Sequence, residues 1–174
     1  MGRILAIDFG RKRTGLAVTD VLRITANPLF TIETKELMNW LTDYFAHEPV
    51  DEVVIGHPTQ MNGEESESMN YIRPFIGNFK KQFPDKPITM YDERFTSVLA
   101  HRAMIDGGMK KKDRQNKAVV DKIAACIILE GYLEKLRVES LEFRVYSLEF
   151  RVESLISYDF TYIFVRAART KKRG

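Results

Sequence analysis

Two short apolar runs constrain the fold of this chain more than any other feature of its sequence. Residues 3–9 (RILAIDF) and 52–56 (EVVIG) each hold consecutive aliphatic side chains with no polar residue between them. A strand that faces water on one side alternates apolar and polar residues, so these runs indicate strands covered on both faces. The sequence therefore predicts an α/β domain in which helices flank a buried sheet.

Turn and helix signals predict the remaining elements. A hairpin is expected over residues 3–20, with Gly10 and Gly15 in tight turns around a basic segment. A third strand over 28–32 would complete three adjacent antiparallel strands. Thr34 is expected to cap the first helix. The other expected elements are helices over 35–47, 64–83, 97–105 and 118–136, and a strand over 88–91. Together they form a mixed sheet flanked by helices.

The end of the chain is a seven-residue repeat. Residues 137–155 read RVESLEF, RVYSLEF and RVESL. The a and d positions of a heptad are occupied by Val138, Leu141, Val145, Leu148, Val152 and Leu155. We therefore divide the chain into a domain over 1–136 and an extension over 137–174 that ends in a basic tail. The heptads permit continuation of the preceding helix or self-association through 138–155, and a recently expanded repeat without a selected role is the alternative.

The sequence predicts a cytoplasmic protein with no membrane partner. Its apolar runs are only a few residues long, too short for a signal-peptide core or for the ~20 residues that span a bilayer. Cys126 is the single cysteine, so no internal disulfide can form and a reducing compartment is expected.

Three carboxylates stand where a sheet and its covering helix can bring them together. Asp8 ends the first predicted strand, Glu93 follows the last one, and Asp121 lies in the first turns of the last helix. Ligands of open sheets gather beyond strand ends, and clustered carboxylates favour hard cations such as Mg²⁺ or Mn²⁺. Such ions can activate water against a phosphodiester. Taken alone, each acid also fits an ordinary turn or surface charge.

Basic residues are concentrated in the second half of the chain. Residues 1–93 contain 10 Lys and Arg against 14 Asp and Glu, whereas residues 94–174 contain 17 against 10. This asymmetry favours a polyanionic partner, although a solvated basic surface also fits it. The predicted phosphate-contacting residues are Lys12, Arg13, Arg94, Lys110, Lys111, Lys112 and Arg114. Contacts of this kind give affinity but not sequence choice.

Four segments together resemble one known family. They are residues 8–17 (DFGRKRTGLA), 56–63 (GHPTQMNG), 92–97 (DERFTS) and 120–125 (VDKIAA). In order and spacing they are similar to the signatures of the YqgF/RuvX family, the Holliday-junction-resolvase-like proteins assigned to pre-16S ribosomal RNA maturation.

The resemblance covers residues 1–136 and implies a ribonuclease-H-like fold. It also implies a divalent-metal site with Asp8, Glu93 and Asp121 as ligands and catalytic residues, with Asp92 as the alternative to Glu93. The cofactor would be Mg²⁺ or Mn²⁺.

The function that the resemblance implies is a nuclease that hydrolyses phosphodiester bonds of structured RNA, in 5′-end maturation of pre-16S ribosomal RNA. Two alternatives keep the same fold: a Holliday-junction DNA resolvase that acts on branched DNA, and a non-catalytic RNA-binding factor of ribosome assembly. A phosphotransferase related to actin and sugar kinases shares the sheet topology, but the chain lacks the second phosphate loop that such enzymes use.

Overall fold

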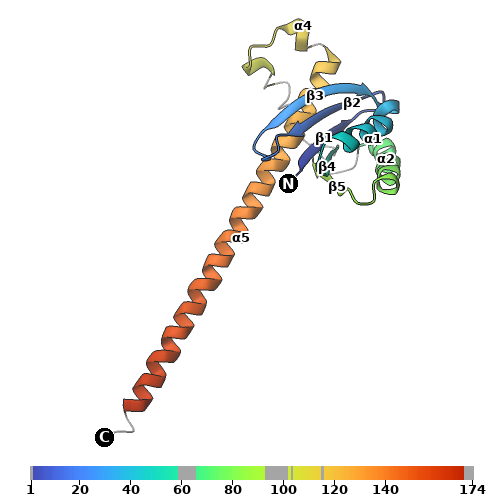
Figure 1. Cartoon of the computed structure of the whole chain (residues 1–174). Helices are drawn as coiled ribbons and strands as arrows, with labels where there is room; N and C mark the ends of the chain where they lie inside the picture. The colour runs from blue at the N-terminus through green and yellow to red at the C-terminus, as the bar shows by residue number, and fades with distance from the viewer. Residues whose placement is uncertain (1, 59–65, 93–101, 103, 115, 171–174) are drawn as a thin grey trace. The chain divides into compact units, whose positions relative to one another are not determined.

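The computed structural model describes residues 2–58, 66–92, 102, 104–114 and 116–170. Figure 1 shows the order of its elements along the chain. The chain divides into two compact units, Met1–Leu133 and Glu134–Gly174, and each unit is described by itself.

Within the described residues, the first unit contains a five-stranded mixed sheet with strand order β3-β2-β1-β4-β5. β2 pairs antiparallel with β1 and β3, whereas β4 pairs parallel with β1 and β5. This is the mixed sheet that the residue pattern predicts, and it agrees with the ribonuclease-H-like fold that the family resemblance implies. The strands are β1 (Arg3–Phe9), β2 (Arg13–Thr19), β3 (Ala26–Glu33), β4 (Val50–His57) and β5 (Ile88–Asp92).

One face of the sheet packs against α1 (Leu37–His47) and α2 (Met69–Gln82). Alternate residues of the strands meet the apolar sides of the two helices there, because successive side chains of a strand point to opposite faces. Buried members of this core include Leu5, Ile7, Leu16, Val53, Ile55, Leu37, Leu41, Ile72 and Phe79.

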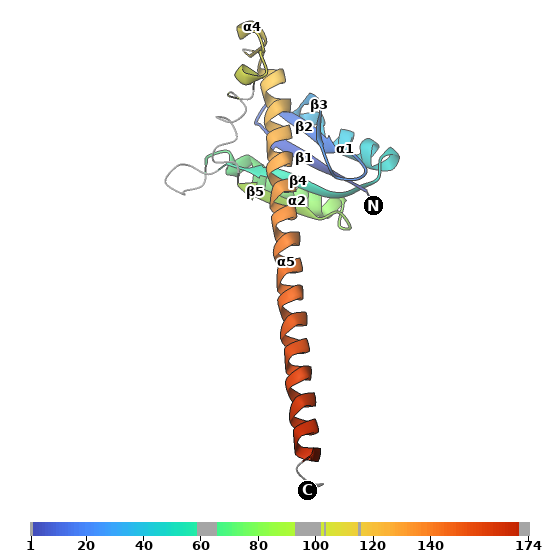
Figure 2. The ribbon, with the colours of Figure 1, turned by 90° about the vertical axis from the view of Figure 1, so that its left-hand side faces the viewer.

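The other face of the sheet is covered by the beginning of α5 (Lys117–Thr170), which crosses the strands in Figure 2. Ala125, Ile128 and Leu129 of this helix are completely buried, as are Ile4 and Ala6 on the remaining side of β1. Coverage of both faces explains the unbroken apolar runs of the central strands, as predicted from the sequence.

Thr34 does not cap the first helix, so that prediction is wrong. It begins the short 3₁₀ helix η1 (Thr34–Glu36), and the first turn of α1 has no side-chain cap. The Thr34 hydroxyl instead donates a hydrogen bond to the carbonyl oxygen of Gly10 at 2.6 Å, and its backbone N–H donates to the carbonyl oxygen of Lys12 at 3.1 Å. Thr34 therefore fixes the β1–β2 turn.

Other boundaries also differ from the prediction. α2 begins at Met69, and residues 59–65, which include the predicted start of this helix, lie outside the described residues. Most of the helix expected over 97–105 also lies outside them. The basic connector before α5 contains a short helix, α4 (Lys111–Arg114).

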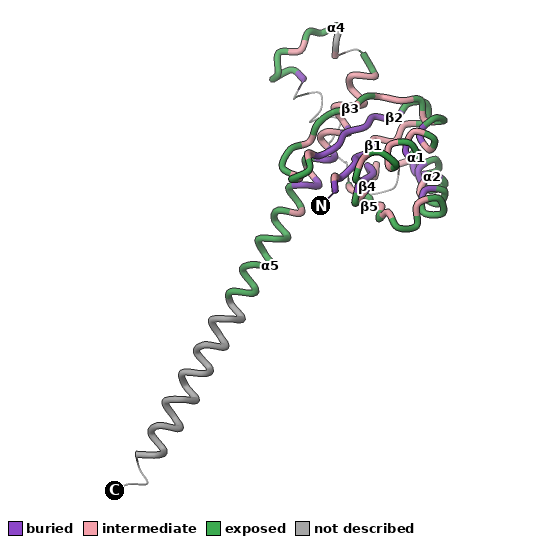
Figure 3. Tube along the Cα trace, in the orientation of Figure 1, coloured by how far each residue is buried: buried purple, intermediate pink, exposed green. Residues whose placement is uncertain are grey.

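The last helix continues far beyond residue 136. α5 runs unbroken through the seven-residue repeat to Thr170, and no glycine or proline occurs between Gly131 and Gly174 to end it. The described side chains of the repeat are exposed, as the green part of α5 in Figure 3 shows. Among the described residues, no helix combines the length and apolar character needed to cross a membrane.

Candidate active site

Asp8 lies near the end of β1, on the face of the sheet that α5 covers. It follows Ile4 and Ala6 on that face, while Phe9 packs on the other face against Phe75 of α2, with ring centroids 4.8 Å apart. Asp8 is half-buried. Burial, and secondly the negative charge of Asp121, raise the pKa of Asp8 from 3.8 to about 7.

Asp121 approaches Asp8 from the first turns of α5. Two contacts fix the start of this helix. The side-chain oxygen of Asn116 accepts a hydrogen bond from the backbone N–H of Ala118 at 3.1 Å, as capping residues do. The hydroxyl of Thr31 in β3 donates to the carbonyl oxygen of Ala118 at 2.6 Å. The helix start is thereby tied to the sheet, and Asp121 lies close enough to Asp8 to shift its pKa.

Gly15 permits the close approach of α5 to the sheet. It is the register partner of Asp8 in β2, so it lies within a strand, and the prediction that placed it in a turn is wrong. A Cβ atom at this position would overlap the backbone carbonyl group of Asp121 and lie 2.9 Å from the backbone nitrogen of Lys122. Only glycine lets the two backbones meet here, and this contact sets the position of Asp121 beside Asp8.

Arg13 provides positive charge at the carboxylate pair. Its Nε donates a hydrogen bond to Oδ2 of Asp121 at 3.0 Å, between side chains that are 42% and 25% exposed. Lys12, in the turn fixed by Thr34, is exposed beside it. Burial of Asp8, and secondly the charge of Asp121, disfavour the ionised form of the Asp8 carboxyl group, as its raised pKa reflects. A bound divalent cation would relieve this, and carboxylate oxygens are its preferred ligands.

The structure brings together two of the three predicted acids, Asp8 and Asp121. Glu93 lies outside the described residues, and within those residues no group of three or more His, Cys, Asp or Glu side chains could hold a metal ion. Asp92, the alternative to Glu93, pairs in register with His57 and shares a face of β5 with Ile88, which packs against the α1–α2 core. Asp92 is therefore on the opposite face of the sheet from Asp8.

Most of the predicted phosphate-contacting residues are accessible. Lys12, Lys110, Lys111 and Lys112 are exposed, Arg114 is partly exposed, and Arg94 lies outside the described residues. The residues between 110 and 114 form or adjoin α4, directly before the helix that carries Asp121. The chain thus places a basic segment next in sequence to the acidic site.

A second attachment of α5 was not predicted from the sequence. Glu52 of β4 accepts hydrogen bonds through one oxygen, Oε1, from the hydroxyl of Tyr132 at 2.5 Å and from the hydroxyl of Thr89 at 2.9 Å. The first bond therefore holds α5 to β4, in addition to its contacts with β2 and β3, and the second joins β5 to the same carboxylate. A usable signal was present, because Glu52 directly precedes the apolar residues of this strand and lies on the same face as Val54.

Tyr132→Phe is expected to lower the free energy of unfolding by about 1–3 kcal/mol, because the partly buried carboxylate of Glu52 loses a short hydrogen bond. Urea denaturation at neutral pH measures the difference. Tyr146→Phe is the matched control, since Tyr146 is 72% exposed and its change should leave the midpoint unaltered. Equal midpoints for Tyr132→Phe and the wild type would show that this hydroxyl does not help to hold α5.

Comparisons with known proteins match the first unit. A family model described as "RuvX: Holliday junction resolvase" matches residues 2–135. Proteins named "Putative pre-16S rRNA nuclease" are similar over the same part. The protein of Phocaeicola vulgatus is 60% identical over 134 residues, which are 77% of this chain and 96% of the relative. That of Bacteroides thetaiotaomicron is 58% identical over 137 residues, 79% of this chain and 99% of the relative.

Among solved structures, a similar chain is T. thermophilus RuvC in complex with a Holliday junction substrate. It is 18% identical, with a TM-score of 0.45 over 74% of this chain and 92% of that chain. The two curated relatives are matched over nearly their whole length, and about a fifth of this chain therefore lies outside each match.

Proposed function

The chain belongs to the RuvX family of Holliday junction resolvases, and from this premise we propose that it is a divalent-metal-dependent nuclease. The observation that carries the proposal is the meeting of Asp8 and Asp121 on one face of the sheet, where the pKa of Asp8 rises to about 7. Two negative carboxylates held close together cost free energy unless a cation binds between them, and carboxylate oxygens are ligands that Mg²⁺ and Mn²⁺ prefer. The name that its relatives bear supports the same reaction class.

We assign the metal-holding role to Asp8, Asp121 and, from the sequence, Glu93. When bound, the metal would supply an activated water and neutralise charge on the phosphate. Arg13 orients the carboxylate of Asp121 through its 3.0 Å hydrogen bond. The exposed Lys12 in the fixed β1–β2 turn would bind substrate phosphates.

We further propose that the substrate is structured RNA, specifically the precursor of 16S ribosomal RNA, and that the protein acts in the cytoplasm. The names of the relatives and the exposed lysines at 110–112 support this choice. Catalysis is assigned to residues 1–136 and not to the extension over 137–174, since the family match ends at residue 135. The family's description favours branched DNA as the second candidate substrate.

The test is cleavage of a labelled small-subunit ribosomal RNA precursor and of a four-way DNA junction by the full chain. Each reaction is run with Mg²⁺, with Mn²⁺ and with EDTA. We expect RNA cleavage that requires the metal and exceeds cleavage of the junction. Preferential cutting of the junction would instead support the resolvase. If neither substrate is cut but RNA binds in a salt-sensitive manner, the protein is a non-catalytic binding factor and the nuclease proposal is wrong.

A further inference from the structure

The part of α5 in the second unit carries an exposed apolar stripe. Its members recur alternately three and four residues apart, which places them on one side of the helix. Val138, Leu141, Val145 and Leu148 are exposed by 45%, 56%, 53% and 58%. Aliphatic side chains lined up in this way lose the free energy of burial unless another surface covers them.

The residue types in the stripe specify the geometry of a partner. Valine occupies the a positions, 138 and 145, and leucine occupies the d positions, 141 and 148; the sequence repeats the pair once more at 152 and 155. β-branched residues at a with leucine at d favour a two-stranded parallel coiled coil over higher oligomers. A helix with the same pattern fits this stripe best.

The charges beside the stripe specify the same partner and its direction. Arg137 and Arg144 occupy g positions, and Glu142 and Glu149 occupy e positions. In a parallel pair each g residue faces the e residue of the following heptad in the other helix, so Arg137 meets Glu142 and Arg144 meets Glu149. In an antiparallel pair g faces g, and arginine would meet arginine. The charge pattern is therefore complementary to itself only in the parallel arrangement.

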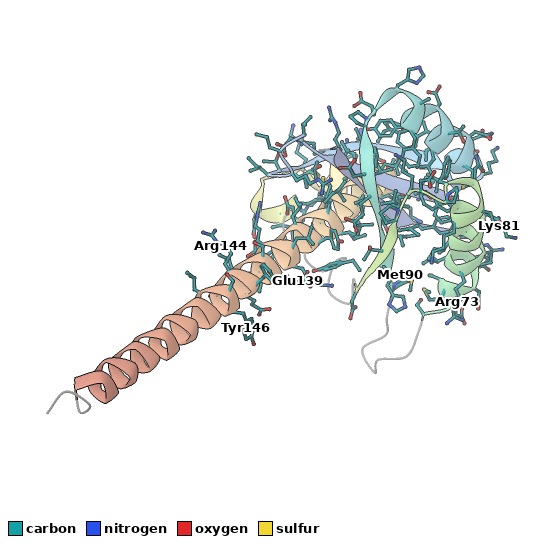
Figure 4. All side chains as sticks on the ribbon, turned by 60° about the horizontal axis from the view of Figure 1, so that its bottom comes forward. Arg73, Lys81, Met90, Glu139, Arg144 and Tyr146 are labelled. Carbon is teal, nitrogen blue, oxygen red and sulfur yellow. The ribbon has the colours of Figure 1, made fainter. Side chains whose placement is uncertain are left out.

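From these observations we propose that residues 137–155 form a parallel two-stranded coiled coil with the same segment of a second copy of this chain. The matched family segment ends at residue 135, so the interface adds a property that the matched domain does not carry. Two apolar residues lie off the stripe, Phe143 at f and Tyr146 at b, and they are 75% and 72% exposed. Figure 4 shows Arg144 and Tyr146 projecting from the helix.

Sedimentation equilibrium of the full chain at increasing concentrations tests the interface. We expect a reversible dimer, and we expect Leu141→Glu combined with Leu148→Glu to raise its dissociation constant at least about 100-fold, because two buried leucines are lost from each helix. Phe143→Glu combined with Tyr146→Glu makes the same chemical change off the stripe and should leave the dimer intact. A monomeric wild type, a trimer or tetramer, or equal loss of the dimer in both variants would overturn the proposal.

Charge reversal tests the direction without changing the stripe. Arg137→Glu with Arg144→Glu puts glutamate at both g and e, and Glu142→Arg with Glu149→Arg puts arginine at both. Each variant alone should dimerise about 10-fold or more weakly than the wild type, and their mixture should recover the wild-type affinity as a heterodimer. An antiparallel pair already has like charges in contact, so two variants that dimerise as well as the wild type would contradict the parallel arrangement.

Discussion

Asp8→Asn is expected to reduce cleavage at least about 100-fold, because it removes a charged ligand from the proposed metal site, and a bound metal would stabilise the transition state by several kcal/mol. The same substitution should abolish the stabilisation of the folded protein by Mg²⁺ or Mn²⁺. Binding of RNA should remain, since the basic residues of the turn and of α4 are unchanged. Single-turnover cleavage, thermal unfolding with and without metal, and RNA binding measure the three effects.

The same variant should stabilise the metal-free protein at pH 8. The folded state raises the pKa of Asp8 from 3.8 to about 7, so the contribution of Asp8 to stability is full below about pH 4 and is lost as the pH rises through 7. Asparagine cannot ionise and avoids that loss. The expected gain at pH 8 is on the order of a few kcal/mol, and it should vanish near pH 4. Urea denaturation in EDTA across this range measures it.

Asp43→Asn is the matched control for Asp8→Asn, because it replaces the same side chain in the same way. Asp43 lies on α1, is largely exposed and is far along the chain from Asp8 and Asp121. It should alter neither cleavage nor the effect of metal on thermal unfolding. If Asp8→Asn cleaves RNA at the wild-type rate, the assignment of the site to Asp8 is wrong. If Asp8→Asn is also no more stable than the wild type at pH 8 in EDTA, ionisation of Asp8 does not destabilise the folded protein as described.

Gly15→Ala is expected to lower both the stability of the fold and the activity of the site. The added methyl group would overlap the backbone of Asp121, which can move only if the start of α5 moves away from β2. Such overpacking costs about 1–3 kcal/mol and occasionally more, and displacement of Asp121 should also lower cleavage and weaken the response to metal. Denaturant unfolding and metal-dependent thermal shifts of the variant measure both consequences.

Gly77→Ala makes the same chemical change as Gly15→Ala, but it is expected to raise the stability of the protein instead of lowering it. Gly77 lies in α2, and apart from its chain neighbours and the nearby backbone of its own helix no atom lies within 4 Å of a Cβ built there. Alanine should therefore stabilise the helix by about 0.5–1 kcal/mol. A Gly15→Ala variant that unfolds at the same denaturant concentration as the wild type would show that α5 does not contact β2 as described.

Local patterns in the sequence predicted the strands and most helices, because burial on one or two faces leaves a period that a short window displays. The continuous runs at residues 3–9 and 52–56 correctly predicted central strands covered on both sides. Asp8 and Asp121 were selected from their positions at a strand end and a helix start, and the structure brings them together. Glu93 stays a prediction.

Other features had no local signature, because they depend on contacts between distant segments. A glycine beside a basic turn is most simply expected to belong to that turn. Nothing in the sequence near Gly15 indicates that it packs against the backbone of a helix more than a hundred residues later. Thr34 has the residue type of a helix cap, yet its hydroxyl reaches Gly10 in another strand connection. Tertiary hydrogen bonds can override a local preference of this size.

The assembly of the carboxylate pair also has a consequence for the newly made chain. Arg13 and Asp121 are 108 residues apart, and at about 5–20 residues per second the ribosome needs roughly 5–20 s to synthesise that stretch. During this time Asp8 has emerged without the helix that completes its site. If Asp8 and Asp121 hold the proposed metal, a nascent chain cannot bind it through both carboxylates until α5 has been made and has docked on the sheet.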